Sequence, residues 1–328
     1  MGDSNRQPLK SRPDRPQLVG DANVSVDVDG LRCYREIHGL ERRGDPIDPV
    51  WELGLTRAAE LFDEFDITAT FFIVGRDLED ERRADQATEL GAMGHELANH
   101  TYDHPYDLRR LSEVEIAYQI GAADRIIADV TGQRPVGFRT PGYNVSNDVL
   151  IASRRGGHRY DASVFPCVSY WTAKSAIMSW RQLLGKPSRS DRTDPKALLA
   201  PRQPYCPDPI EYWKPAAGPS SYVEIPVAAF AGRSMPIIGT SLHLLAPLGL
   251  GRVWTMAHKS FPRFFNLEMH AIDFVDADDL AHVEDVDQLV THQPDLRISW
   301  EKKEKRYRKF FEAMCRDRKM VTLAEATA

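Results

Sequence analysis

Residues 68–75 read TATFFIVG, a short run of β-branched and aromatic side chains that ends in glycine. Such a run, closed by a turn residue, predicts a buried strand. Residues 51–65 come directly before it and carry apolar side chains at helical spacing, namely Leu55, Ala58, Ala59 and Phe62. This segment is therefore predicted to be a helix that precedes the strand.

Two pairs of polar residues flank this helix and strand. Asp27 and Asp29 lie upstream in SVDVDG, and His100 and His104 lie downstream in NHTYDH. Residues two apart share one face of a strand, and residues four apart share one face of a helix. We therefore expect the two side chains of each pair to point in the same direction. The order strand, helix, strand, helix favours a parallel sheet, whose strands supply ligands from their carboxyl ends.

The two pairs together indicate a metal-assisted hydrolase. Two imidazole nitrogens and one carboxylate are the ligands of an open mononuclear site, which keeps positions for water and substrate. The second carboxylate is then free to take a proton. These ligand types favour Zn²⁺, although Co²⁺, Ni²⁺ or Fe²⁺ would also be accepted. Taken singly, each pair also fits a plainer interpretation, as helix-end histidines or as a strand end before a turn.

Three later motifs complete a family resemblance. Residues 138–143 read FRTPGY, residues 160–163 read YDAS, and a histidine follows late in the chain. With the two pairs, these motifs resemble the polysaccharide deacetylases of the NodB-homology type (carbohydrate esterase family 4), over roughly residues 20–328. The resemblance implies an α/β fold, a distorted (β/α)7-type barrel. It also implies a metal-dependent hydrolase that removes an N-acyl group, for which we favour acetyl, from an amino sugar.

The first motif differs from the common family form, which has adjacent aspartates. The Asp-x-Asp variant resembles a largely cytoplasmic subgroup of peptidoglycan-deacetylase-like proteins. That resemblance implies that Asp27 is the general base and that Asp29, His100 and His104 are the metal ligands. Arg139 lies between a predicted strand and a Pro-Gly turn, which favours a loop that faces the site, and we expect it to orient Asp27.

The general acid is predicted to be His270, because LEMHAIDF resembles the closing strand of the subgroup. His243, in GTSLH, is the alternative, although we favour its interpretation as a strand-end histidine with its hydrogen bonds satisfied. Asp161 and Asp273 are candidates for holding Arg139 or His270 in place, as carboxylates behind a metal site do.

Tyr143 follows the Arg-x-Pro motif. A backbone amide near Tyr143 would help the metal to stabilise an oxyanion. Whether the ring of Tyr143 contacts the substrate or only packs stays open.

Length and composition fit one large catalytic domain. The 328 residues are 42% hydrophobic, enough for a substantial core over residues 21–328, while residues 1–20 are polar and predicted to be a disordered tail. The net charge of −6 argues against a nucleic-acid partner. We see no transmembrane run and no signal peptide, and the cysteines are scattered, so a cytoplasmic location is expected. An N-acylated sugar or glycan precursor is then a better substrate than assembled cell wall.

The segment after the fourth motif is predicted to be an insertion, residues 165–220. Residues 166–171 lead into a helix that runs to about residue 184, and a proline-rich loop that bears Tyr205, Tyr212 and Trp213 follows. Such aromatics could form a lid or a platform for a sugar, or could pack against another subunit of a homo-oligomer. Near the end of the chain, a helix is expected over residues 301–316 and a last short strand or cap at residues 321–323.

Two other functions fit the same sequence. The chain could hydrolyse a small non-sugar amide or ureide, as an allantoinase-like relative would. It could also be a non-catalytic sugar-binding relative, although the retained Asp27, Asp29, His100, His104 and Arg139 argue against this.

Overall fold

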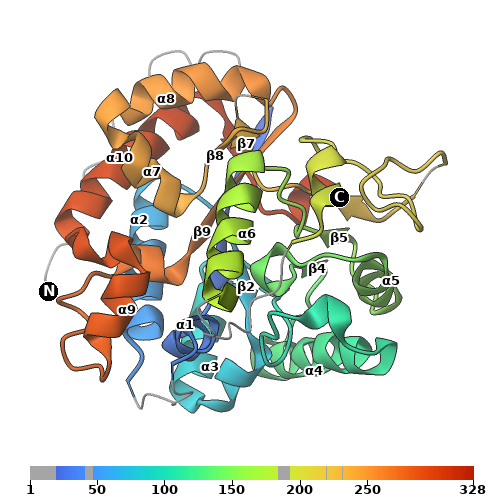
Figure 1. Ribbon diagram of the computed structural model, residues 1–328, viewed down its shortest axis with the longest axis horizontal. Helices are drawn as coiled ribbons and strands as arrows, with labels where there is room; N and C mark the ends of the chain where they lie inside the picture. Colours follow the sequence, from blue (N-terminus) through green and yellow to red (C-terminus); the bar gives the residue numbers. More distant parts are fainter. Residues whose placement is uncertain (1–19, 41–46, 184–192, 219, 231) are drawn as a thin grey trace, which may run out of the picture.

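The computed structural model describes residues 20–40, 47–183, 193–218, 220–230 and 232–328 (Figure 1). The predicted tail over residues 1–20 lies outside the described residues, except for Gly20. Within the described ranges, no helix combines the length and the apolar character that a bilayer crossing demands.

A curled sheet of parallel strands forms the centre of the molecule (Figure 1). Strand β1 (Asp21–Val28) lies between β9 (Phe264–His270) and β2 (Thr70–Ile73). The sheet continues from β2 through β3 (Glu96–Asn99), β4 (Gly137–Phe138), β5 (Tyr160–Asp161) and β6 (Val223–Glu224). The predicted buried strand is β2, and the alternation of strands and helices follows the expected α/β barrel order.

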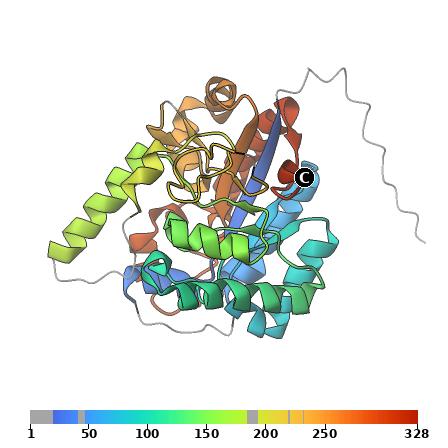
Figure 2. The same cartoon turned by 90° about the vertical axis from the view of Figure 1, so that its right-hand side faces the viewer.

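Helices surround this sheet (Figures 1 and 2). In chain order they are α1 (Leu31–His38), α2 (Thr56–Glu64), α3 (Glu81–Ala92), α4 (Glu113–Thr131), α5 (Asn147–Arg155), α6 (Val168–Leu183), α7 (Gly239–Leu245), α8 (Leu250–Ala257), α9 (Val286–His292) and α10 (Trp300–Asp317). The helix predicted over residues 51–65 begins as a π-helical turn, Val50–Leu55, and continues as α2. Figure 2 shows α6 projecting from the body of the molecule.

Alternation along β1 separates the core from the site. Val24, Val26 and Val28 belong to the large hydrophobic cluster shared with the surrounding helices. Ser25 and Asp27, on the opposite face, form hydrogen bonds with Arg139 inside the curled sheet. Because successive side chains of a strand point to opposite faces, one short segment supplies both core and chemistry.

The last predicted strand is wrong by two residues. Strand β10 is Lys319–Met320 and pairs with Asp21 and Ala22 at the start of β1. Val321 and Leu323 instead pack in a buried cluster with Phe72, on the inner side of the sheet. The apolar side chains therefore mark where the chain enters the core rather than where it pairs with the sheet.

The proline-rich loop packs on itself and its neighbours. Tyr205 and Tyr212 are buried in a hydrophobic cluster with Val145 and Val164, and Trp213 packs against that cluster. The Tyr205 hydroxyl donates to the backbone carbonyl of Tyr212 at 2.7 Å. These rings are part of a local core, so they provide no lid or sugar platform.

Candidate metal centre and active site

The predicted site residues come together at the carboxyl ends of neighbouring strands. Asp27 lies near the end of β1, directly opposite His270 of β9 in the strand register, and Asp29 follows β1. His100 follows β3 and Arg139 follows β4. Because parallel strands end at one edge of a sheet, residues far apart in the chain meet there.

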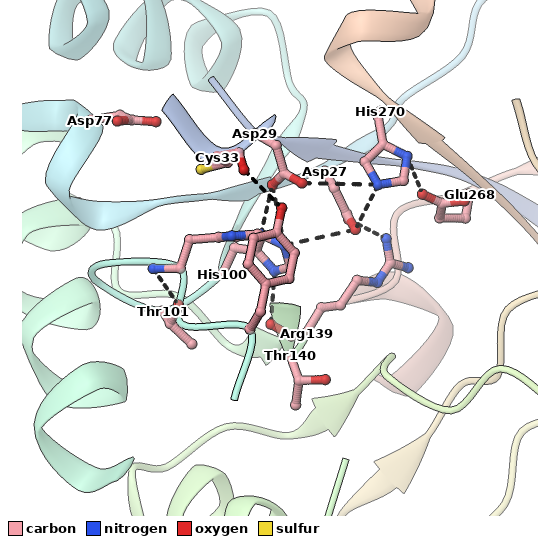
Figure 3. Close-up of polar contacts among 12 residues, drawn as sticks. Asp27, Asp29, Cys33, Asp77, His100, Thr101, Arg139, Thr140, Glu268 and His270 are labelled. Carbon is pink, nitrogen blue, oxygen red and sulfur yellow. Dashed lines mark hydrogen bonds and ion pairs between the residues drawn. The ribbon is translucent and has the colours of Figure 1, made fainter. Parts of the chain in front are cut away.

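Asp29, His100 and His104 face one another as a possible ligand set (Figure 3 shows Asp29 and His100). All three are buried, and one donor atom from each lies within 4.8 Å of the other two. His104 Nε2 is 3.1 Å and His100 Nε2 is 3.4 Å from Asp29 Oδ1. Among the described residues, none of these three atoms has a hydrogen-bond partner. Buried polar atoms without partners are costly, so this arrangement fits a divalent cation.

The two histidines do not lie on a helix, so the predicted reason for their convergence is wrong. They belong to an irregular loop after β3, in which Thr101 and His104 have positive φ angles of 67° and 60°. Asn99 Oδ1 accepts a hydrogen bond from the Thr101 amide at 2.7 Å, and Thr101 Oγ1 accepts one from the His104 amide at 3.1 Å. These hydrogen bonds fold the loop back so that both imidazoles reach Asp29.

A backbone contact orients His100. Its Nδ1 lies 2.8 Å from the carbonyl oxygen of Arg139, an acceptor only, so Nδ1 carries the proton. The other nitrogen, Nε2, is then left bare toward Asp29, which is the orientation that a metal ligand requires. Burial opposes ionisation of Asp29, but protonated imidazoles at His104 and His100 would outweigh it and hold the pKa of Asp29 well below its usual range, and a bound cation would supply the same positive charge in place of those protons. The carboxylate is thus ready to act as an anionic ligand.

Arg139 holds Asp27 in a fully buried contact (Figure 3). Its Nη1 donates to Asp27 Oδ1 at 2.5 Å, and its Nη2 donates to Ser25 Oγ at 2.8 Å. The Nε donates to the carbonyl of Ala162 at 2.8 Å, and the guanidinium lies 4.1 Å from the ring centroid of Phe72. These contacts fix the position of the Asp27 carboxylate beside the guanidinium.

Glu268 is a site residue that the sequence analysis missed. Its Oε1 lies 2.8 Å from His270 Nδ1, and it is fully buried (Figure 3). Burial opposes the charge on His270, but Glu268, with Asp27 and Asp29, raises its pKa well above the usual value. The signal was the i, i+2 spacing of Glu268 and His270, which puts both on the same face of β9.

The other carboxylates predicted to support the site act through the backbone. Asp273 Oδ2 accepts from the backbone amide of His270 at 2.9 Å, whereas the ring of His270 is held by Glu268. Asp161 accepts from the amide and the hydroxyl of Ser163, both at 2.9 Å, and Ser163 Oγ accepts from the Thr140 amide at 2.8 Å. Asp161 therefore braces the chain next to the Arg-x-Pro motif, and within the described part of the chain it forms no hydrogen bond with the guanidinium.

The alternative histidine lies away from this cluster. His243 is in helix α7 rather than at a strand end, and its Nε2 is 2.9 Å from the Tyr307 hydroxyl. Burial and the positive charges of Lys303 and Arg306 lower its pKa to about 3. A neutral, buried histidine of this kind is unsuited to donate a proton, so the geometry favours His270 as the acid.

A cavity of about 480 Å³ opens onto the cluster. Asp29 and His270 line it, together with Tyr143, which is buried and has no partner for its hydroxyl among the described residues. Tyr170 and Lys174 of α6 form part of its wall. Of the predicted insertion, the helix thus borders the site, while the proline-rich loop is absent from the cavity lining.

Residues 47–160 match the family model for polysaccharide deacetylase. Within these residues the chain is similar to that family, and the match confirms the resemblance inferred from the motifs. The match ends at β5, so β9, with Glu268 and His270, lies beyond it.

Curated relatives match the chain over part of their length. A peptidoglycan deacetylase of Helicobacter pylori is 27% identical over 145 residues, which cover 42% of this chain and 47% of the relative. A chitooligosaccharide deacetylase of Azorhizobium caulinodans is 33% identical over 101 residues, which cover 30% of this chain and 47% of the relative. The chain spans at most about half the length of the curated relatives named here.

The fold is shared with a solved protein. A Mycobacterium smegmatis protein, crystallised as a candidate polysaccharide deacetylase, superposes with a TM-score of 0.58 and 16% identity, and covers 97% of this chain and 91% of that one. At this identity the likeness shows the fold alone. It confirms the predicted α/β architecture with a curled parallel sheet.

Proposed function

We propose that this protein is a metal-dependent amide hydrolase that removes an N-acetyl group from an amino sugar or glycan precursor. The main support is the set of three buried, unpartnered donor atoms of Asp29, His100 and His104, with the Arg139-bound Asp27 beside them. The names of the curated relatives, deacetylases of peptidoglycan and of chitooligosaccharides, favour a sugar amide.

The ligand set is suited to Zn²⁺, which would acidify a water molecule and polarise the acyl carbonyl when bound. Asp27 would accept a proton from a water molecule, because Arg139 holds its carboxylate in place. His270 donates a proton to the departing nitrogen, because Glu268 keeps the imidazole charged. The backbone amide near Tyr143 is the candidate donor to the oxyanion.

The proposed acid and base lie close to each other and to Asp29. His270 Nε2 lies 4.0 Å from Asp27 Oδ2 and 4.0 Å from Asp29 Oδ2. A single bound amide would then be attacked by water from the Asp27 side and would receive a proton on its nitrogen from the His270 side. The register that pairs Asp27 with His270 on adjacent strands supports this arrangement.

We also propose where the protein acts and which residues form its catalytic domain. A cytoplasmic site of action is supported by the cysteines, since Cys33, Cys167, Cys206 and Cys315 form no disulfide bond within the described residues. We assign residues 21–328 to one catalytic domain and leave a homo-oligomer open. Fractionation of cells that express the chain would test its location.

Asp27→Asn tests the base assignment. We expect turnover of N-acetylglucosamine oligomers to fall by about a hundred-fold or more, because an amide cannot accept the proton. Metal content, measured by atomic emission, should stay at the wild-type level, because Asp29 and the two histidines remain. Asp287→Asn, which changes an exposed carboxylate of α9, is the control. Full turnover by Asp27→Asn would refute the assignment.

A further inference from the structure

A second tyrosine of the cavity, Tyr34, has no role in the mechanism above. We propose that its hydroxyl donates a hydrogen bond to an oxygen of the bound substrate and so selects a polyhydroxylated ring over a small apolar amide. This inference rests on the proposed function, because it assigns a substrate contact in the same cavity.

Tyr34 is close to the candidate metal ligands in sequence and in space. It lies in α1, which begins two residues after Asp29, and its side chain is buried, with 6% of its surface exposed. The ring packs in the large hydrophobic cluster, while the residue also lines the cavity. The charged groups that influence it are Asp29, Asp273 and Asp295, which line the same cavity. Tyr34 is therefore part of the cavity wall as well as of the core.

The hydroxyl of Tyr34 has no hydrogen-bond partner among the described residues. A buried hydroxyl without a partner is destabilising and is rare in native proteins, so it needs an explanation. The hydroxyl of Tyr143 is in the same situation in the same cavity. These two groups reach the cavity from different elements, α1 and the turn after β4. A single ligand with several oxygen atoms could satisfy both.

The surroundings make Tyr34 a donor. Burial and the negative charges of Asp29 and Asp273 raise its pKa well above the usual value, so the phenol keeps its proton. Ionised carboxylates in this cavity can only accept hydrogen bonds, and a neutral phenol supplies the complementary donor. Sugar hydroxyls and ring oxygens are acceptors, and aromatic walls such as those of Tyr34 and Tyr170 suit a sugar ring. A hydroxyl-free amide would leave Tyr34 unpaired and be bound less well.

Tyr34→Phe removes one oxygen and keeps the ring, so the core contacts should persist. We expect kcat/KM for N-acetylglucosamine oligomers to fall roughly ten-fold, mainly through KM, as for the loss of one hydrogen bond. Hydrolysis of N-cyclohexylacetamide, which has the amide and a ring but no hydroxyl, should not change. The matched control is Tyr212→Phe, which removes a buried hydroxyl outside the cavity. Thermal unfolding and metal content should be unchanged in both variants.

Calorimetric binding of glucosamine to the zinc-loaded protein gives a readout that does not depend on turnover. We expect Tyr34→Phe to weaken this binding roughly ten-fold and Tyr212→Phe to leave it unchanged. Equal affinity and equal KM in wild type and Tyr34→Phe would overturn the inference while the proposed function stood. A wild-type protein that binds the sugar through Tyr34 but hydrolyses no N-acetylated sugar would instead refute the proposed function alone. A wild-type protein that binds no sugar would overturn the inference.

Discussion

At the scale of single residues, the site depends on pairs that fix orientation and charge together. Arg139 holds Asp27, and Glu268 holds His270, so that the base and the acid each have a buried partner of opposite charge. His100 is oriented by the backbone of Arg139, which links the ligand set to the base. Removing a single member should therefore change the protonation of its partner, which a pH profile can detect.

Glu268→Gln should shift the alkaline limb of the pH profile to lower pH. Glu268 raises the pKa of His270, and the imidazolium is the form that donates the proton, so a lower pKa means loss of activity at a lower pH. The raised pKa also contributes stability below the unfolded value of about 6.5, which is lost as pH rises through the folded pKa. The measurement is kcat/KM against pH, with an NMR titration of His270.

The control for this prediction is Glu301→Gln, which changes an exposed carboxylate of α10. An alkaline limb that stays in place in Glu268→Gln would show that Glu268 does not set the protonation of His270.

At the scale of elements, the sequence predicts long segments with a periodic apolar pattern. It does not predict short strands that form only by pairing with other strands. Helix α10 buries Tyr307, Phe310, Phe311 and Met314 on one face, as its sequence pattern predicts. Strands β4 and β5 have two residues each, which are too few for a periodic pattern of side chains. Their pairing depends instead on the close approach of one strand to the other. At Gly137 of β4, a Cβ atom would overlap the ring and hydroxyl of Tyr160 in β5.

Gly137→Ala should destabilise the protein by roughly 1–3 kcal/mol, because the added methyl group has no space. Tyr160 would also be displaced from Glu96, to which its hydroxyl donates at 2.8 Å, and Arg139 follows directly after β4, so activity should fall too. Denaturant unfolding measures the change. The matched control is Gly251→Ala in α8, where a Cβ atom meets nothing within 4 Å and the substitution should be neutral or stabilising. Equal stability of Gly137→Ala and wild type would contradict the close-packing argument.

At the scale of the whole molecule, the candidate ligands link two strands that are separated in sequence. Asp29 follows β1, while His100 and His104 follow β3, with β2 between them in the sheet. A cation bound by all three would therefore tie several strands together. Since a ligand that binds only the folded state stabilises it, metal loading should be measurable as stability.

Zinc at a hundred times its dissociation constant should stabilise the wild-type protein by about 2.7 kcal/mol, and a chelator should reverse the effect. His104→Ala should lose most of this response, because one of the ligands is missing. His282→Ala, which changes an exposed histidine, should keep it. Denaturant midpoints with and without metal test this, and an identical metal response in His104→Ala and wild type would remove His104 from the ligand set.

The sequence by itself indicated the alternation of strands and helices, the resemblance to a family, and most of the residues that meet at the site. These follow from local spacing and from motif order, as with Asp27, Asp29 and the two histidines. The local spacing of Glu268 and His270 also places both side chains on one face of β9, although the sequence analysis did not use it. Only the tertiary structure decided how the histidine loop folds back toward Asp29, and that Tyr205 and Tyr212 pack in a core away from the cavity. The reason is physical: the loop meets Asp29, and the two tyrosines meet Val145 and Val164, across long separations in the chain, and local sequence patterns carry no information about which distant side chain will fill a given space.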